Sequence, residues 1–347
     1  MQRYLVLDDE RNYPELIDIL HAERVVIRDV ALSRGSLFHR TMVRALRQIT
    51  NSIRLFSLVF SGSEGVLIIC QSSHYAALIA GKIGRLFRRD VSIYLFNFFV
   101  NPATRRSLVR PIVRSLLRQR VGIYVNAPNE VVYYRSLNPS IDVHYYPFCL
   151  GKVEGVDPSS VPQVNTVFSG GHTNRDYESL FQAAGRMPDI KFLVACSAAT
   201  VLPLRIPQNV SLVMDTPPAE FHRLMASARA VVVPLASDIG SSGQMVALAA
   251  MQFGKVVVYA DYPSLSQYFE DGVTGIRYTP LDVDSLTQAI STAYETGGPT
   301  SAMGSRARAA AEEKYSWDAY ERELINHVNS FSRDVSSRGR STPSENG

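Results

Sequence analysis

Short apolar runs alternate with longer amphipathic stretches along most of the chain. In the first part, apolar runs fall at residues 4–7, 25–27, 66–70, 91–96, 123–126 and 142–146, and helical spacing appears at 73–87 and 104–119. Runs of this length that are apolar throughout are typical of strands buried on both faces of a parallel sheet. The alternation of strands and helices therefore predicts a doubly wound α/β domain over residues 1–150.

A second series of the same kind follows residues 151–163, where the alternation is interrupted. This segment, GKVEGVDPSSVPQ, is rich in Gly, Pro and Ser, and we interpret it as a linker. The domain predicted after it spans residues 164–314, with strands at 165–168, 191–195, 210–214, 230–233 and 256–259. A long helix from 302 to 331, interrupted near Tyr315-Ser316-Trp317, closes the pattern, with residues 315–332 as its last part. The polar residues 333–347 contain almost nothing apolar and are expected to be disordered.

Composition places the chain among ordinary globular proteins. It has 347 residues, enough for two domains with full cores, and is 46% hydrophobic and 20% charged. The three cysteines lie far apart in apolar surroundings, which favours a reducing compartment such as the cytoplasm. The first residues are too acidic for a signal peptide, and no apolar run reaches the roughly 20 residues that cross a bilayer. We therefore expect a cytoplasmic protein that is soluble or peripherally bound to a membrane.

Charge is unevenly distributed between the two predicted domains. Residues 1–150 carry 20 Lys and Arg against 11 Asp and Glu, whereas the remainder carries 16 against 21. The basic domain contains four arginines spaced four residues apart, with apolar residues that include Ile112 on the opposite side of the predicted helix: Arg106, Arg110, Arg114 and Arg118. Such a helix suits an anionic lipid surface, or it is the solvated face of a core helix. Nucleic acid is disfavoured as a partner, because no aromatic residues are interleaved with these arginines.

Two segments of the second domain carry groups suited to a diphosphate. The first runs from Ser169 to Arg175 after a predicted strand; its paired glycines allow close approach to the backbone, and its arginine can hold a phosphate. The second, Gly-Ser-Ser-Gly-Gln, opens a helix whose first N–H groups attract anions. An ordinary glycine turn and an ordinary helix cap are the alternatives. The donor-site candidates in these segments are Ser169, Gly170, Gly171, Arg175, Ser241, Ser242, Gly243 and Gln244.

Residues 229–281 resemble the donor-binding half of GT-B glycosyltransferases in the large retaining family, group 1 or family 4-like. Leu248-Ala-Ala-Met251-Gln-Phe-Gly254-Lys-Val-Val is similar to that family's L-E-A-M-A-x-G-x-P-V, and Asp271-Gly272-Val-Thr-Gly275 to its D-G-x-x-G. The resemblance implies two Rossmann-like domains facing across a cleft, with terminal helices that pack back on the first domain. It also implies a nucleoside-diphosphate sugar as the donor substrate, with neither a metal nor another cofactor.

The chain departs from that family at its charged positions. The family places two glutamates eight residues apart, and the matching positions here are Ser241 and Ala249. Either Asp238 supplies the sugar contact, or Gln244 and the serine hydroxyls replace the acids. The family also pairs an arginine with a later lysine; Arg175 falls on the lysine position, while the arginine position falls on Ser169 or Gly170.

Four further candidates follow predicted strands. Asp215 and Thr216 resemble the segment that abuts the nucleotide base, although Thr216-Pro-Pro also reads as a helix start. In the first domain, Asn97 lies where many family members have a histidine, and His74 is the candidate that can titrate. A structural role at a helix start is the alternative for His74. We place both residues on the acceptor side.

The function predicted from these features is sugar transfer from a nucleoside-diphosphate sugar to a polysaccharide or lipid-linked glycan, in surface or exopolysaccharide biosynthesis. Arg175 and the N–H groups of residues 241–244 are expected to stabilise the leaving diphosphate, with Asp238 as the catalytic carboxylate. Retention of anomeric configuration is implied by the resemblance. The alternatives are a catalytically silent GT-B binding or assembly protein, and a nucleotide-sugar epimerase with Asp238 as its acid or base.

Overall fold

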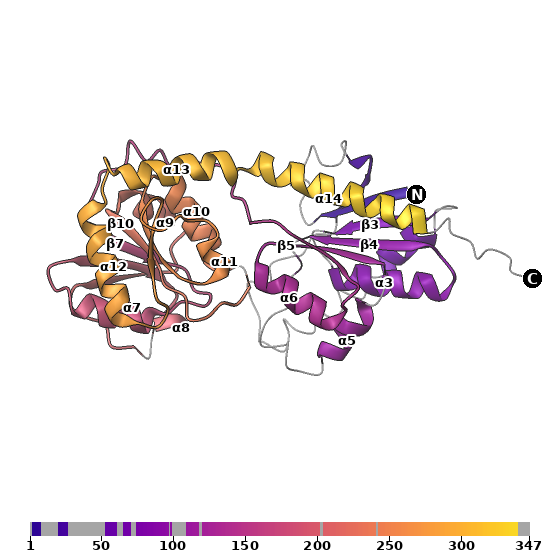
Figure 1. Cartoon of the computed structure of the whole chain (residues 1–347), viewed down its shortest axis with the longest axis horizontal. Helices are drawn as coiled ribbons and strands as arrows, with labels where there is room; N and C mark the ends of the chain where they lie inside the picture. The colour runs from indigo at the N-terminus through magenta and orange to yellow at the C-terminus, as the bar shows by residue number, and fades with distance from the viewer. Residues whose placement is uncertain are drawn as a thin grey trace, which may run out of the picture. The chain divides into compact units, whose positions relative to one another are not determined.

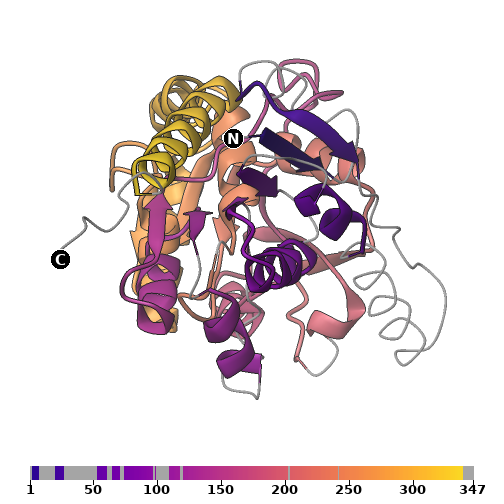
Figure 2. The same ribbon diagram turned by 90° about the vertical axis from the view of Figure 1, so that its right-hand side faces the viewer.

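The computed structural model describes residues 2–7, 20–26, 53–60, 65–70, 74–96, 98, 109–117, 120–201, 204–240 and 242–338. The chain forms two compact units, each drawn in Figures 1 and 2. Unit 1 comprises Met1–Asn126, Glu130–Tyr146 and Glu321–Gly347, and unit 2 comprises Ala127–Asn129 and Pro147–Tyr320. Each unit has a parallel sheet of six strands, so the predicted α/β class with two doubly wound domains is confirmed.

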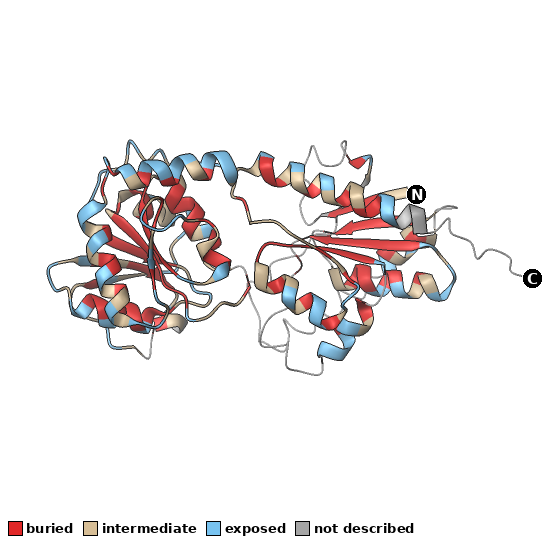
Figure 3. Ribbon diagram, in the orientation of Figure 1, coloured by how far each residue is buried: buried red, intermediate tan, exposed pale blue. Residues whose placement is uncertain are grey.

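The sheet of unit 1 has the strand order β2-β1-β3-β4-β5-β6. Its strands are β1 Gln2–Leu7, β2 Glu23–Val26, β3 Val66–Cys70, β4 Val91–Phe96, β5 Val121–Val125 and β6 Asp142–Tyr145. All residues of β3, β4 and β5 are buried, as expected for strands covered on both faces (Figure 3). The labelled helices between these strands are α3 His74–Leu86, α5 Val109–Leu116 and α6 Pro128–Leu137.

The end of the chain completes the core of unit 1. Helix α14, Trp317–Arg338, lies along one face of this sheet, with α3 on the other (Figure 1). Phe331 is buried with its ring 5.5 Å from that of Tyr94, and Arg3 of β1 donates to Asn329 Oδ1 at 3.0 Å and to Ser332 Oγ at 3.2 Å. The helix continues past the expected end at residue 332, because neither glycine nor proline occurs before Gly339.

The sheet of unit 2 has the order β12-β11-β10-β7-β8-β9. Its strands are β7 Thr166–Gly170, β8 Lys191–Cys196, β9 Val210–Met214, β10 Ala230–Val233, β11 Val256–Ala260 and β12 Ile276–Tyr278. Strand β12 was not predicted, because three residues are too few to show a period. The helices are α7 Tyr177–Gly185, α8 Ala198–Val201, α9 Pro218–Ser227, α10 Gln244–Gln252, α11 Pro263–Ser266, α12 Val283–Thr296 and α13 Ala302–Lys314.

The segment interpreted as a linker is anchored on unit 2. Gln252, the last residue of α10, donates from Nε2 to the carbonyls of Leu150 and Gly151 and accepts from the Val153 N–H at 3.0 Å. Further along, Gln163 accepts from Lys255 Nζ at 2.7 Å. Among the described helices, none combines the length and the apolar character needed to cross a bilayer.

Candidate functional site

The direction of the chain reverses in the middle of the second sheet. From β7 the strands proceed outward through β8 to β9, and from β10 they proceed the other way through β11 to β12. Strands β7 and β10 are hydrogen-bonded neighbours, so the loops that leave their carboxyl ends diverge from a common point. Open α/β sheets bind ligands at such a switch point. Both predicted phosphate-binding segments lie on these two loops.

The two glycines of the β7–α7 loop are required for different reasons. A Cβ on Gly170 would lie 2.4 Å from the ring of Phe221 on α9, so this glycine allows close packing. Gly171 has a φ of +107°, and a Cβ there would lie 2.5 Å from Nη2 of Arg175. The loop tip beyond them, His172 and Thr173, is exposed.

Arg175 folds over its own loop. Its Nε donates to the Gly170 carbonyl at 2.9 Å and its Nη1 to the Thr173 carbonyl at 2.8 Å, which leaves Nη2 out of both bonds, above Gly171. The side chain is half-buried, and this burial lowers the pKa of its guanidinium. An arginine remains protonated under physiological conditions nonetheless. The loop therefore places a fixed positive charge at the switch point.

The β10–α10 loop carries Asp238, Ser242 and Gly243. The Oδ1 atom of Asp238 accepts from the Ser264 N–H at 3.3 Å, while the hydroxyl of Ser242 donates to the Ile239 carbonyl at 2.9 Å. Gly243 is the N-cap of α10 with a φ of +82°, and no side chain of the described residues caps this helix. The first N–H groups of α10 consequently end at the same loop. Ser241 lies outside the described residues.

Ser169 and Gln244 are both buried, at 1% exposure each. The hydroxyl of Ser169 donates to the Val232 carbonyl at 2.9 Å, which links β7 to β10. The amide of Gln244 donates to the Ser264 carbonyl at 3.1 Å, which links α10 to α11. Both side chains are therefore hydrogen-bonded inside the domain, although we expected them at the surface of the two loops. Ala249, the family's second glutamate position, is 1% exposed in the core.

The contact that joins the two loops involves two residues that were not candidates. The side chain of Asn174 donates to the Ser237 carbonyl and accepts from the Ser237 hydroxyl. One sequence feature was available, because asparagine adopts positive φ more readily than most residues and Asn174 has a φ of +57°. Its partner across the loops could not be read from the sequence.

Asp215 and Thr216 follow β9 on the same edge of the sheet. Asp215 is exposed with a φ of +49°, and its N–H donates to the Cys196 carbonyl at 3.2 Å. Thr216 is half-buried and precedes Pro217, the N-cap of α9. Strand β8 separates β9 from β7, so these residues lie further along the edge from Arg175.

Comparison with known families identifies this domain. Residues 167–296 match the sequence profile of the family described as glycosyl transferases group 1. The matched range runs from β7 to the end of α12 and contains both loops of the switch point. This domain belongs to the group 1 glycosyltransferase family. A sequence search among curated proteins finds no match.

Solved structures show that the chain has the GT-B fold. Anabaena Alr3699/HepE in complex with UDP and glucose aligns with a TM-score of 0.64 at 15% identity, over 95% of this chain and 100% of that one. A glycosyltransferase from Rickettsia africae ESF-5 aligns with a TM-score of 0.64 at 9% identity, over 96% and 98%. Sucrose-phosphate synthase from Thermosynechococcus elongatus aligns with a TM-score of 0.63 at 14% identity, over 90% and 84%.

In unit 1, His74 begins α3. Its Nε2 lies 2.9 Å from the Phe96 carbonyl at the end of β4. Burial lowers the pKa of the imidazole, although the nearby carbonyls of Phe96 and Cys70 oppose the shift. The ring is therefore neutral at pH 7 and is held between the carboxyl ends of two adjacent strands. Asn97, the other acceptor-side candidate, lies outside the described residues.

The predicted basic helix is described over α5. Arg110 and Arg114 are exposed, while Arg106 and Arg118 lie outside the described residues. On the apolar side of this helix, Ile112 is 58% exposed, whereas Val113 and Leu116 are buried. Helix α5 contacts α3, where Lys82 Nζ donates to Ser115 Oγ at 2.7 Å.

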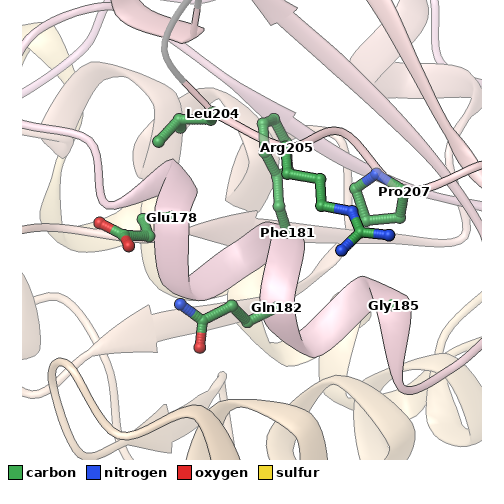
Figure 4. A pocket seen from close by; sticks show the side chains of 7 residues that line it. All are labelled: Glu178, Phe181, Gln182, Gly185, Leu204, Arg205 and Pro207. Atoms are coloured by element: carbon green, nitrogen blue, oxygen red, sulfur yellow. The ribbon is translucent and has the colours of Figure 1, made fainter.

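A surface pocket of about 410 Å³ lies elsewhere in unit 2 (Figure 4). It is lined along α7 by Glu178, Phe181, Gln182 and Gly185, and along the segment before β9 by Leu204, Arg205 and Pro207. The pocket follows the outer side of α7 away from the carboxyl ends of the strands. None of the predicted donor-site residues lines this pocket.

Proposed function

We propose that this glycosyltransferase takes its sugar from a uridine-diphosphate sugar and transfers it to a polysaccharide or lipid-linked glycan, in surface or exopolysaccharide biosynthesis. The observation that carries the proposal is the meeting of Arg175 and the start of α10 at one switch point. The choice of uridine is supported by Alr3699/HepE, whose structures hold UDP, glucose and UDP-glucose.

Departure of the diphosphate is the step that needs stabilisation. As the bond from the anomeric carbon to the phosphate oxygen breaks, negative charge grows on the diphosphate and positive charge on the sugar. Arg175 meets the negative charge with its guanidinium, and the N–H groups at the start of α10 add the positive end of the helix dipole. In this proposal no metal is needed to balance the diphosphate.

Asp238 is the carboxylate that we assign to the sugar. It lies on the β10–α10 loop, half-buried, with Oδ1 held by the Ser264 N–H. A carboxylate in this place favours the oxocarbenium-like sugar electrostatically. In this proposal Asp215 and Thr216 bind the nucleoside of the donor, and His74 and Asn97 bind the acceptor. Retention of anomeric configuration is part of the proposal, by the resemblance to the family.

The deciding experiment is a calorimetric titration with UDP of the wild type, Arg175→Ala and Arg205→Ala. Arg205 is a matched control, because it is an exposed arginine of the same unit away from the switch point. We expect saturable binding by the wild type and by Arg205→Ala, and at least roughly tenfold weaker binding by Arg175→Ala, as one charge-assisted contact to phosphate would give. Equal binding by all three proteins would remove Arg175 from the site.

A catalytically silent binding protein is the second candidate. The observation in its favour is Ala249, which is buried where the family has a carboxylate. Incubation with UDP-glucose and glycan acceptors separates the two functions. Release of UDP that is lost in Asp238→Asn supports the transferase, whereas tight UDP binding without turnover supports the silent protein.

We also propose that unit 1 meets an anionic membrane at the cytoplasmic face, where a lipid-linked acceptor would be found. The surface formed by α3 and α5 exposes basic and large apolar side chains together: Ile79, Lys82, Leu86, Phe87, Arg110, Ile112 and Arg114. Basic residues around apolar ones suit phospholipid headgroups. Sedimentation with phosphatidylglycerol vesicles should fall in Arg110→Glu/Arg114→Glu and persist in Arg306→Glu/Arg308→Glu, a control pair on α13. Equal sedimentation of both pairs would contradict this surface.

A further inference from the structure

The two loops of the switch point are joined by a reciprocal pair of side-chain bonds. The amide Nδ2 of Asn174 donates to the Ser237 carbonyl at 2.7 Å, and the Ser237 hydroxyl donates back to Asn174 Oδ1 at 2.8 Å. Each residue is thus both donor and acceptor toward the other. Both are half-buried, which shields the pair from water without removing it from the loop surface.

The backbone reinforces the same junction. Arg175 and Leu235 pair as an isolated antiparallel bridge outside the sheet. In this bridge the Asp176 N–H donates to the Pro234 carbonyl at 3.3 Å, and the Ala236 N–H donates to the Asn174 carbonyl at 3.2 Å. We call this set of contacts, residues 174–176 with 234–237, the loop clasp. It is a short antiparallel ladder between two loops, and the chain continues from these loops to opposite sides of the sheet.

Arg175, which carries the positive charge, is itself part of the loop clasp. Arg175 lies between Asn174, which bonds to the opposite loop, and Asp176, which caps α7 by accepting from the Ser179 N–H at 3.0 Å. On the other side, the residues after Ser237 lead directly to the N-cap of α10 at Gly243. The clasp therefore holds residues 234–237, from which the loop continues toward α10, beside Arg175.

We propose that Asn174 and Ser237 are positioning residues of the donor site: they lock the two loops into one unit, so that Arg175 and the start of α10 face the diphosphate in fixed register. The identity of the ligand rests on the proposed function. The physical reason for the lock is preorganisation, because a loop that is ordered before binding loses less conformational entropy when the ligand arrives.

The chemistry of the two side chains provides clean variants. Asn174→Gly deletes both side-chain bonds yet keeps a residue that adopts the left-handed backbone at little cost. Ser237→Ala removes the hydroxyl donor and leaves the Ser237 carbonyl, and Ser237→Thr restores a hydroxyl. Ser227→Ala is the matched control, since its hydroxyl donates to the Leu224 carbonyl within α9, at 2.7 Å, and joins no loops.

The first measurement is amide hydrogen exchange of the ligand-free protein over residues 234–243. We expect Asn174→Gly and Ser237→Ala to speed exchange there roughly tenfold, although the first substitution lies on the other loop. Ser237→Thr and Ser227→Ala should exchange as the wild type does. This readout reports the lock directly and needs no nucleotide. Unchanged exchange in Asn174→Gly would overturn the proposal.

The second measurement is the Kd for UDP. Asn174→Gly should weaken binding roughly tenfold, and Asn174→Gly/Arg175→Ala should bind less weakly than the sum of the two single effects, because residues that act partly through one contact are not additive. Faster exchange with wild-type affinity would overturn the positioning role. Failure of the wild type to bind UDP would contradict the proposed donor, and the exchange result would still decide whether the loops are locked.

Discussion

Gly171 is constrained by its own backbone and by the side chain four residues ahead. Its φ of +107° is one that other residues rarely adopt, and its missing Cβ makes room for Nη2 of Arg175. Any side chain here displaces the guanidinium or the loop. The glycine is thus part of how the positive charge is held over the backbone.

Gly171→Ala tests this constraint against a matched glycine. We expect a loss of about 1–2 kcal/mol in unfolding free energy from backbone strain, together with at least roughly tenfold weaker UDP binding. Gly155→Ala has a similar φ of +77° but meets nothing within 4 Å, so it should lose stability and keep its affinity. Urea denaturation and calorimetry measure the two effects. Equal UDP affinity in both variants would contradict the packing of Arg175 on Gly171.

Lys255 is a buried lysine immediately before β11. Its Nζ donates to Gln163 Oε1 at 2.7 Å and to the Ala228 carbonyl at 2.8 Å, and the residue is 3% exposed. Burial lowers the pKa of this lysine from 10.5 to about 8. Between those two values the unfolded chain holds the proton and the folded chain does not. Raising the pH through this window therefore favours the folded state.

Lys255→Met removes that titration. The unfolding free energy of the wild type should rise relative to the Met variant by up to about 3 kcal/mol between pH 8 and 10.5. Comparing the two proteins cancels the titration of the buried tyrosines, which they share. Urea denaturation at several pH values gives the difference. Parallel pH profiles would show that the lysine is not perturbed in the folded state.

At the scale of elements, α7 and α12 begin with the same cap. Asp176 accepts from the Ser179 N–H at 3.0 Å, and Asp282 accepts from the N–H groups of Asp284 and Ser285 at 2.9 and 3.0 Å. A carboxylate at this position satisfies free N–H groups and favours the helix dipole. Only the first of these caps belongs to the loop clasp.

The two caps should differ in their effect on the ligand. Asp176→Ala and Asp282→Ala should each cost about 1 kcal/mol of stability. The first should also weaken UDP binding, because the N-cap fixes the backbone that follows Arg175, whereas the second should not. Asp176→Asn retains an oxygen acceptor and should recover most of both losses. Thermal denaturation and calorimetry provide the measurements, and weakened binding in Asp282→Ala would indicate a general effect of stability.

At the scale of the whole molecule, unit 1 is assembled from the two ends of the chain. Phe331 of α14 is buried against Tyr94, and a Cβ on Gly122 would lie 3.0 Å from the Phe331 ring. The helix thus packs tightly on β4 and β5. Unit 1 therefore depends on residues that follow all of unit 2 in the sequence, whereas unit 2 is nearly continuous.

Phe331→Ala should destabilise unit 1 by about 3–5 kcal/mol, the usual cost of a cavity left by a buried phenylalanine. Hydrogen exchange should accelerate in β4 and β5 and remain slow in β7 and β10, with UDP binding unchanged. Phe331→Leu should show a smaller loss, because it refills part of the space. Equal acceleration in the strands of unit 2 would contradict the division into two units.

Local pattern was sufficient to predict most of the fold. Buried parallel strands are apolar throughout, so their positions appeared in the sequence, and helices between them implied two doubly wound sheets. The pattern failed at β12, which has three residues, and it does not distinguish Ile112 from Val113 on the apolar side of α5, of which only Val113 is buried. Periodicity describes one segment at a time and carries no information on the neighbour that covers it.

For the site, the sequence determined that glycines and Arg175 follow β7 and that glycines precede α10, because those residue types have few other uses together. Tertiary structure decided what each does. Ser169 is buried because β7 pairs with β10, and Gln244 is hydrogen-bonded because α10 contacts α11. Asn174 bonds to Ser237 because two loops that are distant in the sequence lie side by side. A hydrogen bond between residues 63 positions apart depends on strand order, which no local pattern contains.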